Sequence, residues 1–258
     1  MYEYEGLKDM MFIALYCVAA FAALVAAVYL LWRRGNAFMQ EEALGGPERL
    51  WIRSSLRLRR WTAVLMLAVF MSHVWWAVPV AAPTGDATNA AMTGESVRLL
   101  RNIVCITLDR LSFVPLMMCV LLRMLQDRRR PAWPVWAAVA PVAVLAVVCI
   151  ATGSDVFEPV VEWYMAVVAL AFLVYYVRAV RQYGRWLNDN FADLENKEVW
   201  QSLLLLAFTL FVHVAYSTNG GALVTEYLAQ VNTLVIIAFL LWRVETLEEL
   251  PSEEEIES

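Results

Sequence analysis

Ionisable and amide side chains inside long apolar stretches are the residues of this sequence most able to do chemistry. An ionised group at the centre of a membrane helix costs about 3 kcal/mol unless it is paired or hydrated, so each is a candidate for ligand binding or proton sensing. The candidates are His73, Asp109, Arg110, Glu162, His213, Glu226 and Gln230.

The spacing of polar residues around Asp109 predicts one polar helix face. Arg98, Asn102, Cys105, Asp109 and Ser112 follow one another at intervals of four, three, four and three residues, which align on a helix. We expect this face to lie inside a helical bundle. Arg110 lies about 100° further round and should pair with a different helix. The alternative is that Asp109 and Arg110 only fix packing.

The remaining candidates are expected in the same outer half of the bundle. Glu226, Gln230 and Thr233 repeat the four-and-three spacing, and counting from the helix ends puts His73 and His213 at similar depth. An outward-open polar cavity lined by Trp and Tyr would suit a small-molecule or proton sensor. Haem or a metal ion held by His73 and His213 is an alternative without motif support. We therefore predict no cofactor and no metal.

Enzymatic motifs are missing from the sequence. G-x-S-x-G and H-E-x-x-H do not occur, and no Lys lies in an apolar stretch where a retinal Schiff base would need one. We therefore predict that the chain is not an enzyme.

Composition indicates a membrane protein. Of the 258 residues, 61% are hydrophobic and 17% are charged, against about 45–50% and 25% in soluble domains. The net charge of −5 argues against direct nucleic-acid binding by this chain. The four cysteines lie singly in apolar runs, which favours buried thiols over disulfides.

Seven apolar stretches are long enough to cross a bilayer as helices, which predicts an all-α membrane protein. The spans are 10–32, 61–82, 102–122, 131–153, 158–178, 199–216 and 225–243. They form a domain over 1–250, which is followed by an acidic tail over 251–258 that we expect to be disordered. The acidic residues before the first stretch are unlike a signal peptide, so we expect a retained anchor.

The distribution of cations predicts the orientation. Alternate loops and the C-terminal tail hold sixteen of the twenty Lys and Arg residues, and the opposite side holds three. By the positive-inside rule, the N-terminus is outside and the C-terminus is in the cytosol. The expected location is a bacterial inner membrane, with multiple crossings.

Two segments on the cytosolic side are candidates for coupling to an output. The fifth helix should continue past the membrane, through Arg185 and into an acidic stretch with Asp189, Asn190 and Asp193. The last helix should continue with Leu240, Val244, Leu247 and Leu250 at spacings of four, three and three, ended by Pro251. This apolar stripe predicts pairing with a second copy as a homodimer.

The first of these segments also carries a family resemblance. The stretch YGRWLNDNFADLENKEVW over 183–200, followed by two spans and LWRVETL over 241–247, resembles the membrane region of multi-span AraC-type helix-turn-helix regulators of anaerobic gut bacteria. The resemblance implies transmembrane control of transcription. The DNA-binding part of that family would begin where this sequence ends, so the output is expected through a C-terminal domain beyond this sequence or a cytosolic regulator.

These observations favour a membrane-embedded sensor that couples an external small-molecule or proton cue to a cytosolic transcriptional output. A small transporter or channel that uses the outer polar cavity is the alternative. A structural subunit of a membrane complex is a further alternative.

Overall fold

The computed structural model describes residues 9–33, 55–77, 87–152, 154, 156–192, 194, 197–219 and 222–250. Within these residues it is all-helical and contains no strand. Its helices are α1 (Met10–Trp32), α2 (Leu56–Ala77), α3 (Ala87–Arg123), α4 (Trp133–Thr152), α5 (Glu158–Asn190), α6 (Gln201–Asn219) and α7 (Leu223–Thr246).

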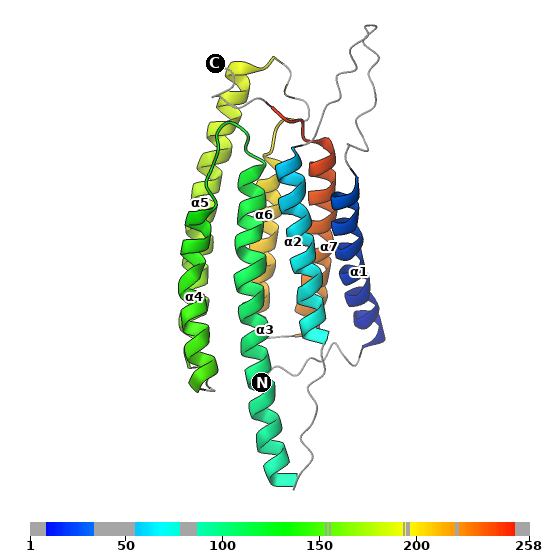
Figure 1. Cartoon of the computed structure of the whole chain (residues 1–258), viewed down its shortest axis with the longest axis vertical. Coiled ribbons are helices and arrows are strands. Elements are labelled where there is room, and N and C mark those ends of the chain that lie inside the picture. Colours follow the sequence, from blue (N-terminus) through cyan, green and yellow to red (C-terminus); the bar gives the residue numbers. More distant parts are fainter. Residues whose placement is uncertain are drawn as a thin grey trace.

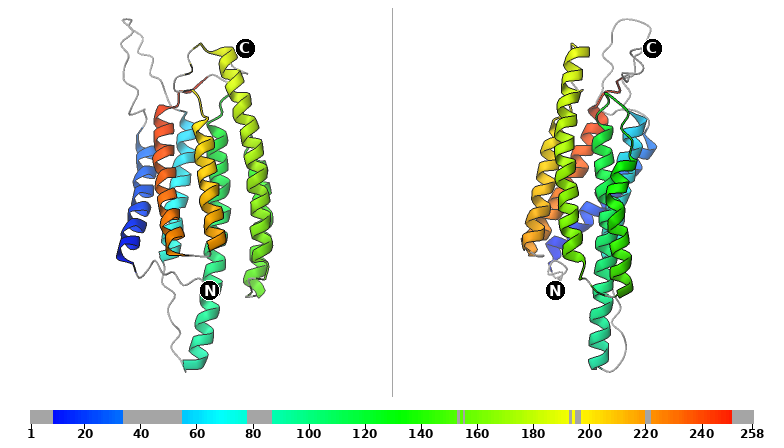
Figure 2. Two further views of the ribbon diagram at one scale, coloured as in Figure 1. Left: turned by 180° about the vertical axis from the view of Figure 1, so that it is seen from behind. Right: turned by 90° about the vertical axis from the view of Figure 1, so that its left-hand side faces the viewer.

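The helices lie side by side and the chain alternates in direction from each helix to the next (Figure 1). Helices α1, α2 and α7 pack together, α3 packs between α2 and α4, and α6 packs on α7. Seen from behind, α5 runs along one side of the bundle, next to α6 (Figure 2). The N-terminal part of α3 extends beyond its neighbours at the lower end in Figure 1.

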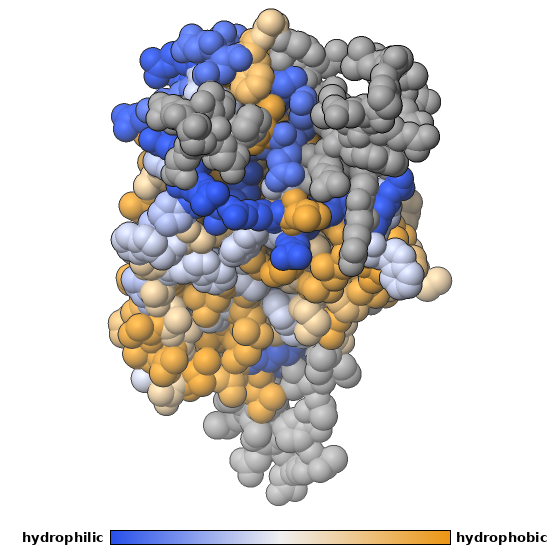
Figure 3. Space-filling model, turned by 45° about the horizontal axis from the view of Figure 1, so that its top comes forward, coloured by the Kyte–Doolittle hydropathy of each residue, from blue (hydrophilic) through white to orange (hydrophobic). Residues whose placement is uncertain are grey.

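The two ends of the bundle differ in chemistry. We call the end at which α2 begins and α3 and α7 finish the arginine-rich end, after Arg57, Arg59, Arg123 and Arg128–Arg130. The other end is the histidine end, after His73. Hydrophilic residues gather at the arginine-rich end, and hydrophobic side chains cover the flank below it (Figure 3).

Five helices are long and apolar enough to cross a membrane: α1, α4, α5, α7 and the part of α3 from Val97. The apolar part of α6, Gln201–Tyr216, is shorter. Apolar side chains also point outward, and Val144 and Leu170 are more than 60% exposed. An exposed apolar flank is favourable only in lipid, so the protein is helical and membrane-embedded.

Three helix boundaries bear on the predicted sites. Helix α3 begins at Ala87, fifteen residues before the predicted start of the third span at residue 102, so most of the stretch between the second and third predicted spans is helical. Helix α5 continues to Asn190, as the sequence predicted. Helix α7 ends at Thr246, and Leu247 is extended with φ −76° and ψ 120°. The prediction that α7 continues to Leu250 is wrong. The predicted tail over 251–258 lies outside the described residues.

The predicted dimer stripe is also wrong. Leu240, Val244, Leu247 and Leu250 are all buried in the main core of the chain itself, with exposures from 0% to 8%. The stripe is covered by the bundle because α7 packs between α1, α2 and α6. These side chains are therefore not available for pairing with a second copy.

Candidate functional site

His73, near the end of α2, is held by both of its ring nitrogens. Nδ1 lies 2.7 Å from the carbonyl oxygen of Val69, and Nε2 lies 3.0 Å from Oε1 of Gln230 on α7. The Tyr16 hydroxyl on α1 donates to the backbone carbonyl of His73 at 2.6 Å, and the two rings lie 4.6 Å apart. His73 thus joins three helices at the histidine end.

Asp109 on α3 accepts hydrogen bonds from two neighbouring indoles of α2. Trp76 Nε1 donates to one carboxylate oxygen at 2.7 Å, and Trp75 Nε1 donates to the other at 3.2 Å. Arg101 fixes the same segment, since its guanidinium donates to the Trp76 carbonyl at 2.5 Å and lies 5.8 Å from the Trp76 ring. The polar face predicted for α3 therefore contacts α2.

Arg110 points to a different helix from Asp109, as the 100° offset predicts. Its guanidinium lies 2.8 Å from a carboxylate oxygen of Glu158 and 3.9 Å from one of Glu162, both on α5. His213 on α6 lies within electrostatic range of Arg110 and Glu162. Its side chain is exposed on the bundle surface.

The structure does not bring the predicted residues around one cavity. His73 contacts Gln230, Asp109 bonds to α2 within electrostatic range of His73, and Arg110, Glu162 and His213 form a separate group beside α5. Glu226 is buried in the first turn of α7. Both ring nitrogens of His73 contact groups of α2 and α7, whereas His213 lies near Arg110 and Glu162. Within the described residues, no cluster of three or more potential metal ligands occurs.

Asp9 lies at the histidine end of the bundle, just before α1. Its carboxylate accepts from the Met11 amide at 2.9 Å and from the Tyr227 hydroxyl at 2.9 Å. These hydrogen bonds hold the pKa of Asp9 below its usual value, with the amide as the larger cause. Asp9 therefore stays ionised in the neutral and mildly acid range, where a histidine changes its charge.

A buried ion pair joins α2 to α7 at the arginine-rich end. The guanidinium of Arg59 and the carboxylate of Glu245 are in direct contact, with side chains 3% and 2% exposed. Arg59 also donates to the Arg33 carbonyl at 2.5 Å, directly after α1. The pair thus joins the ends of α1 and α7 to the beginning of α2.

The segment after α7 is fixed to two other parts of the chain. Gln126, in the connector between α3 and α4, donates to the Glu248 carbonyl at 2.7 Å and accepts from the Leu250 amide at 2.8 Å. Lys197 lies 2.9 Å from the Glu248 carboxylate, and Arg243 donates to the Glu198 carbonyl. These contacts hold the chain after Thr246 in a non-helical conformation.

The predicted output residues fall into two groups. Arg185, Asp189 and Asn190 on α5 are exposed at the arginine-rich end. Leu247 and Leu250 are buried within the bundle. Asp193 lies outside the described residues.

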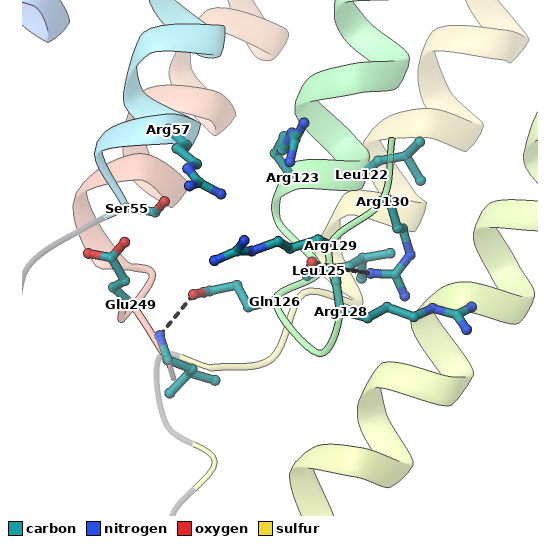
Figure 4. Close-up of a pocket in the computed structure, with 11 residues that line it drawn as sticks. Ser55, Arg57, Leu122, Arg123, Leu125, Gln126, Arg128, Arg129, Arg130 and Glu249 are labelled. Atoms are coloured by element: carbon teal, nitrogen blue, oxygen red, sulfur yellow. Dashed lines mark hydrogen bonds between the residues drawn. The ribbon is translucent and has the colours of Figure 1, made fainter. Parts of the chain in front are cut away.

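A polar cavity of about 230 Å³ opens at the arginine-rich end. Figure 4 shows its walls: the start of α2, the end of α3, the α3–α4 connector and the segment after α7. The residues that line it are Ser55, Arg57, Leu122, Arg123, Leu125, Gln126, Arg128, Arg129, Arg130, Glu249 and Leu250. Five of these are arginines and one is acidic.

Sequence reasoning missed the Arg59–Glu245 pair and the arginine cavity. In the sequence, Arg59 is one of the many cations between the predicted spans, and Glu245 lies just after the last predicted span. The signal in the sequence that could have indicated this pair is that α2 and α7 each carry polar residues near both ends.

Comparison with protein-family models, with curated proteins and with solved structures found no match.

Proposed function

We propose that this chain is a membrane signalling module that couples a proton cue at the histidine end to an output at the arginine-rich end. In this proposal all seven helices cross a bacterial inner membrane, with the N-terminus outside and the C-terminus in the cytosol. The excess of Lys and Arg in alternate loops supports that orientation.

The observation that carries the proposal is that polar side-chain contacts join α2 to α7 at both ends. His73 contacts Gln230 at one end, and Arg59 contacts Glu245 at the other. The paired residues are fourteen apart on α2 and fifteen apart on α7, or about 21–23 Å along each helix. A shift of one helix against the other changes the geometry of both contacts.

The hydrogen bond between His73 and Gln230 depends on the charge of the imidazole ring. Nδ1 faces a carbonyl oxygen and must carry a proton, so the state of Nε2 decides the charge. A protonated ring donates from Nε2 to the Gln230 oxygen, which lies 3.0 Å away. A neutral ring accepts at Nε2, which requires the Gln230 amide to turn its NH₂ group inward. Protonation therefore reverses the polarity of a contact between α2 and α7.

The opposite end offers a way to transmit that change. Beyond Glu245 the chain enters the segment that Gln126 and Lys197 hold. A displaced α7 would loosen these contacts and alter the surface near Arg185, Asp189 and Asn190. A cytosolic transcriptional regulator, or a C-terminal output domain beyond this sequence, would read that surface. A homodimer would have to use a surface other than the buried leucine stripe.

Replacing Gln230 by leucine is expected to loosen the far end of α7. The variant loses the His73 contact, worth about 1 kcal/mol, which corresponds to roughly fivefold faster amide exchange at Leu250 if α7 moves as one body. Hydrogen-exchange mass spectrometry of the 247–250 peptide in lipid nanodiscs measures this. Thr233→Val is the matched control, because the Thr233 hydroxyl donates to the Ala229 carbonyl of its own helix. Equal exchange in both variants and the wild type contradicts the coupling.

A small transporter or channel is the competing proposal, because charged groups also lie within the apolar helices. Flux of protons or small ions into liposomes separates the two, since a signalling module should conduct nothing. A structural subunit predicts co-purification with a membrane complex and indifference to Asp109→Asn.

A further inference from the structure

Two cavities lie on the same side of helices α2 and α3. The arginine cavity includes Arg57 and Arg123, and a second cavity of about 430 Å³ includes Val64 and Leu116. Its full lining is Arg60, Trp61, Val64, Leu111, Ser112, Leu116 and Trp136. We call this second cavity the apolar groove.

Helical spacing shows that the cavities follow one another along the bundle. On α2, Arg57 is four residues from Trp61 and seven from Val64. On α3, Ser112 and Leu116 are eleven and seven residues from Arg123. Intervals of four, seven and eleven return to the same face of a helix. The apolar groove therefore continues from the arginine cavity toward the middle of the apolar helices.

We propose that the two cavities together bind one anionic phospholipid, with its phosphate headgroup in the arginine cavity and an acyl chain in the apolar groove. This inference goes beyond the signalling role and requires only that the helices are embedded in lipid.

The charges of the arginine cavity favour a phosphate. In Figure 4, Arg57 from α2 and Arg129 from the connector extend toward each other, with Arg123 on α3 beside them. Arg128 donates to Gln182, and Arg130 is held by Asp127 at 2.6 and 2.9 Å. Arg57, Arg123 and Arg129 also line the cavity, and Glu249 is the one acid in its described lining. Guanidinium groups bind phosphate oxygens in a planar, bidentate geometry.

The size and position of the cavities favour a lipid over a soluble molecule. A volume of about 230 Å³ is below the roughly 300 Å³ at which pockets for drug-sized ligands begin, and it suits a compact headgroup. The groove is lined almost wholly by aliphatic and indole groups, and Val64 is 46% exposed to the surroundings of the bundle. Trp61 and Trp136 line the groove. Trp is enriched in membrane proteins near the level of the lipid headgroups.

The lipid would also contact the segment after α7. Glu249 and Leu250 form one wall of the arginine cavity, and Gln126 joins that wall to the connector. Headgroup binding would therefore stabilise the same segment that the signalling proposal expects to move.

Native mass spectrometry of the purified full chain tests the proposal with phosphatidylglycerol, phosphatidylcholine and glycerol 3-phosphate as probes. We expect a saturable phosphatidylglycerol adduct and weaker binding of the other two. Each cation near a lipid surface adds about 1 kcal/mol, so Arg57→Gln combined with Arg123→Gln should weaken phosphatidylglycerol binding at least about tenfold. The control is Arg178→Gln with Arg181→Gln, which removes the same charge from exposed positions on α5.

A second variant tests the acyl chain separately. Val64→Trp fills the groove and should weaken phosphatidylglycerol binding, whereas Val144→Trp on the outward face of α4 should not. If phosphatidylcholine binds equally well, or if the arginine variants bind like the wild type, the lipid is an unspecific annular one and the proposal is wrong. If glycerol 3-phosphate binds as tightly and Val64→Trp has no effect, the site takes a soluble phosphate and the lipid assignment is overturned.

Discussion

Replacing Arg59 by methionine is expected to lower the free energy of unfolding by about 3–5 kcal/mol, because the change leaves the Glu245 carboxylate buried without its cation. Both side chains are almost fully buried and in contact, so water cannot replace the lost partner. The Tyr29 hydroxyl also bonds to Glu245, but a neutral donor compensates only part of a missing guanidinium.

Thermal unfolding in detergent, followed by a thiol-reactive dye, measures the loss. Cys105, Cys119 and Cys149 are buried and become reactive on unfolding, and Cys17→Ser removes the exposed thiol. Arg60→Met is the matched control, since the Arg60 side chain is exposed on the next position of α2. The double variant Arg59→Met with Glu245→Met should recover most of the stability, because two apolar side chains replace a buried ion pair at little cost. Equal melting of Arg59→Met and Arg60→Met contradicts the buried pair.

Replacing Asp109 by leucine is expected to cost about 2–6 kcal/mol, because two indole N–H groups lose their acceptor and each costs about 1–3 kcal/mol when left unsatisfied. Ser72 donates to the same carboxylate and would lose its partner as well. Asp109→Asn keeps one carbonyl oxygen as an acceptor, so it should cost less and leave the protein folded and abundant.

The same unfolding assay, combined with tryptophan fluorescence, orders the variants as wild type, Asp109→Asn and Asp109→Leu. Asp189→Asn, on the exposed surface of α5, controls for the loss of a charge alone. If Asp109→Leu is as stable as the wild type, the indole contacts do not hold α2 against α3. If Asp109→Asn fails to fold, the residue serves packing alone.

The helical fold and the direction of its polar faces could be predicted from the sequence because both depend on local spacing. Asp109 and Arg110 are adjacent, and the 100° turn between them sends one side chain to α2 and the other to α5. The continuation of α5 to Asn190 follows in the same way from the residues of that helix.

The partners of the predicted residues could not be derived, because they depend on which helices pack together. Similar depth left open that His73 and His213 share a ligand, whereas the structure shows α7 next to α2, where it supplies Gln230 as the partner of His73. The prediction of where α7 ends was wrong for a similar reason. Leu247 and Leu250 fit a helical stripe, but Gln126 and Lys197 lie far away in the sequence and hold that segment in an extended form.

The coupling between the two ends is tested by a distance between spin labels at the arginine-rich end, measured while the histidine end is protonated. Leu56→Cys on α2 and Trp242→Cys on α7 provide exposed labelling sites in the Cys17→Ser background. When the pH is lowered from about 8 to about 5, the proposal predicts that the separation shifts by about 1–2 Å. Gln230→Leu should abolish the shift. The same separation at both pH values, or the same shift in the wild type and Gln230→Leu, would contradict proton coupling through α2 and α7.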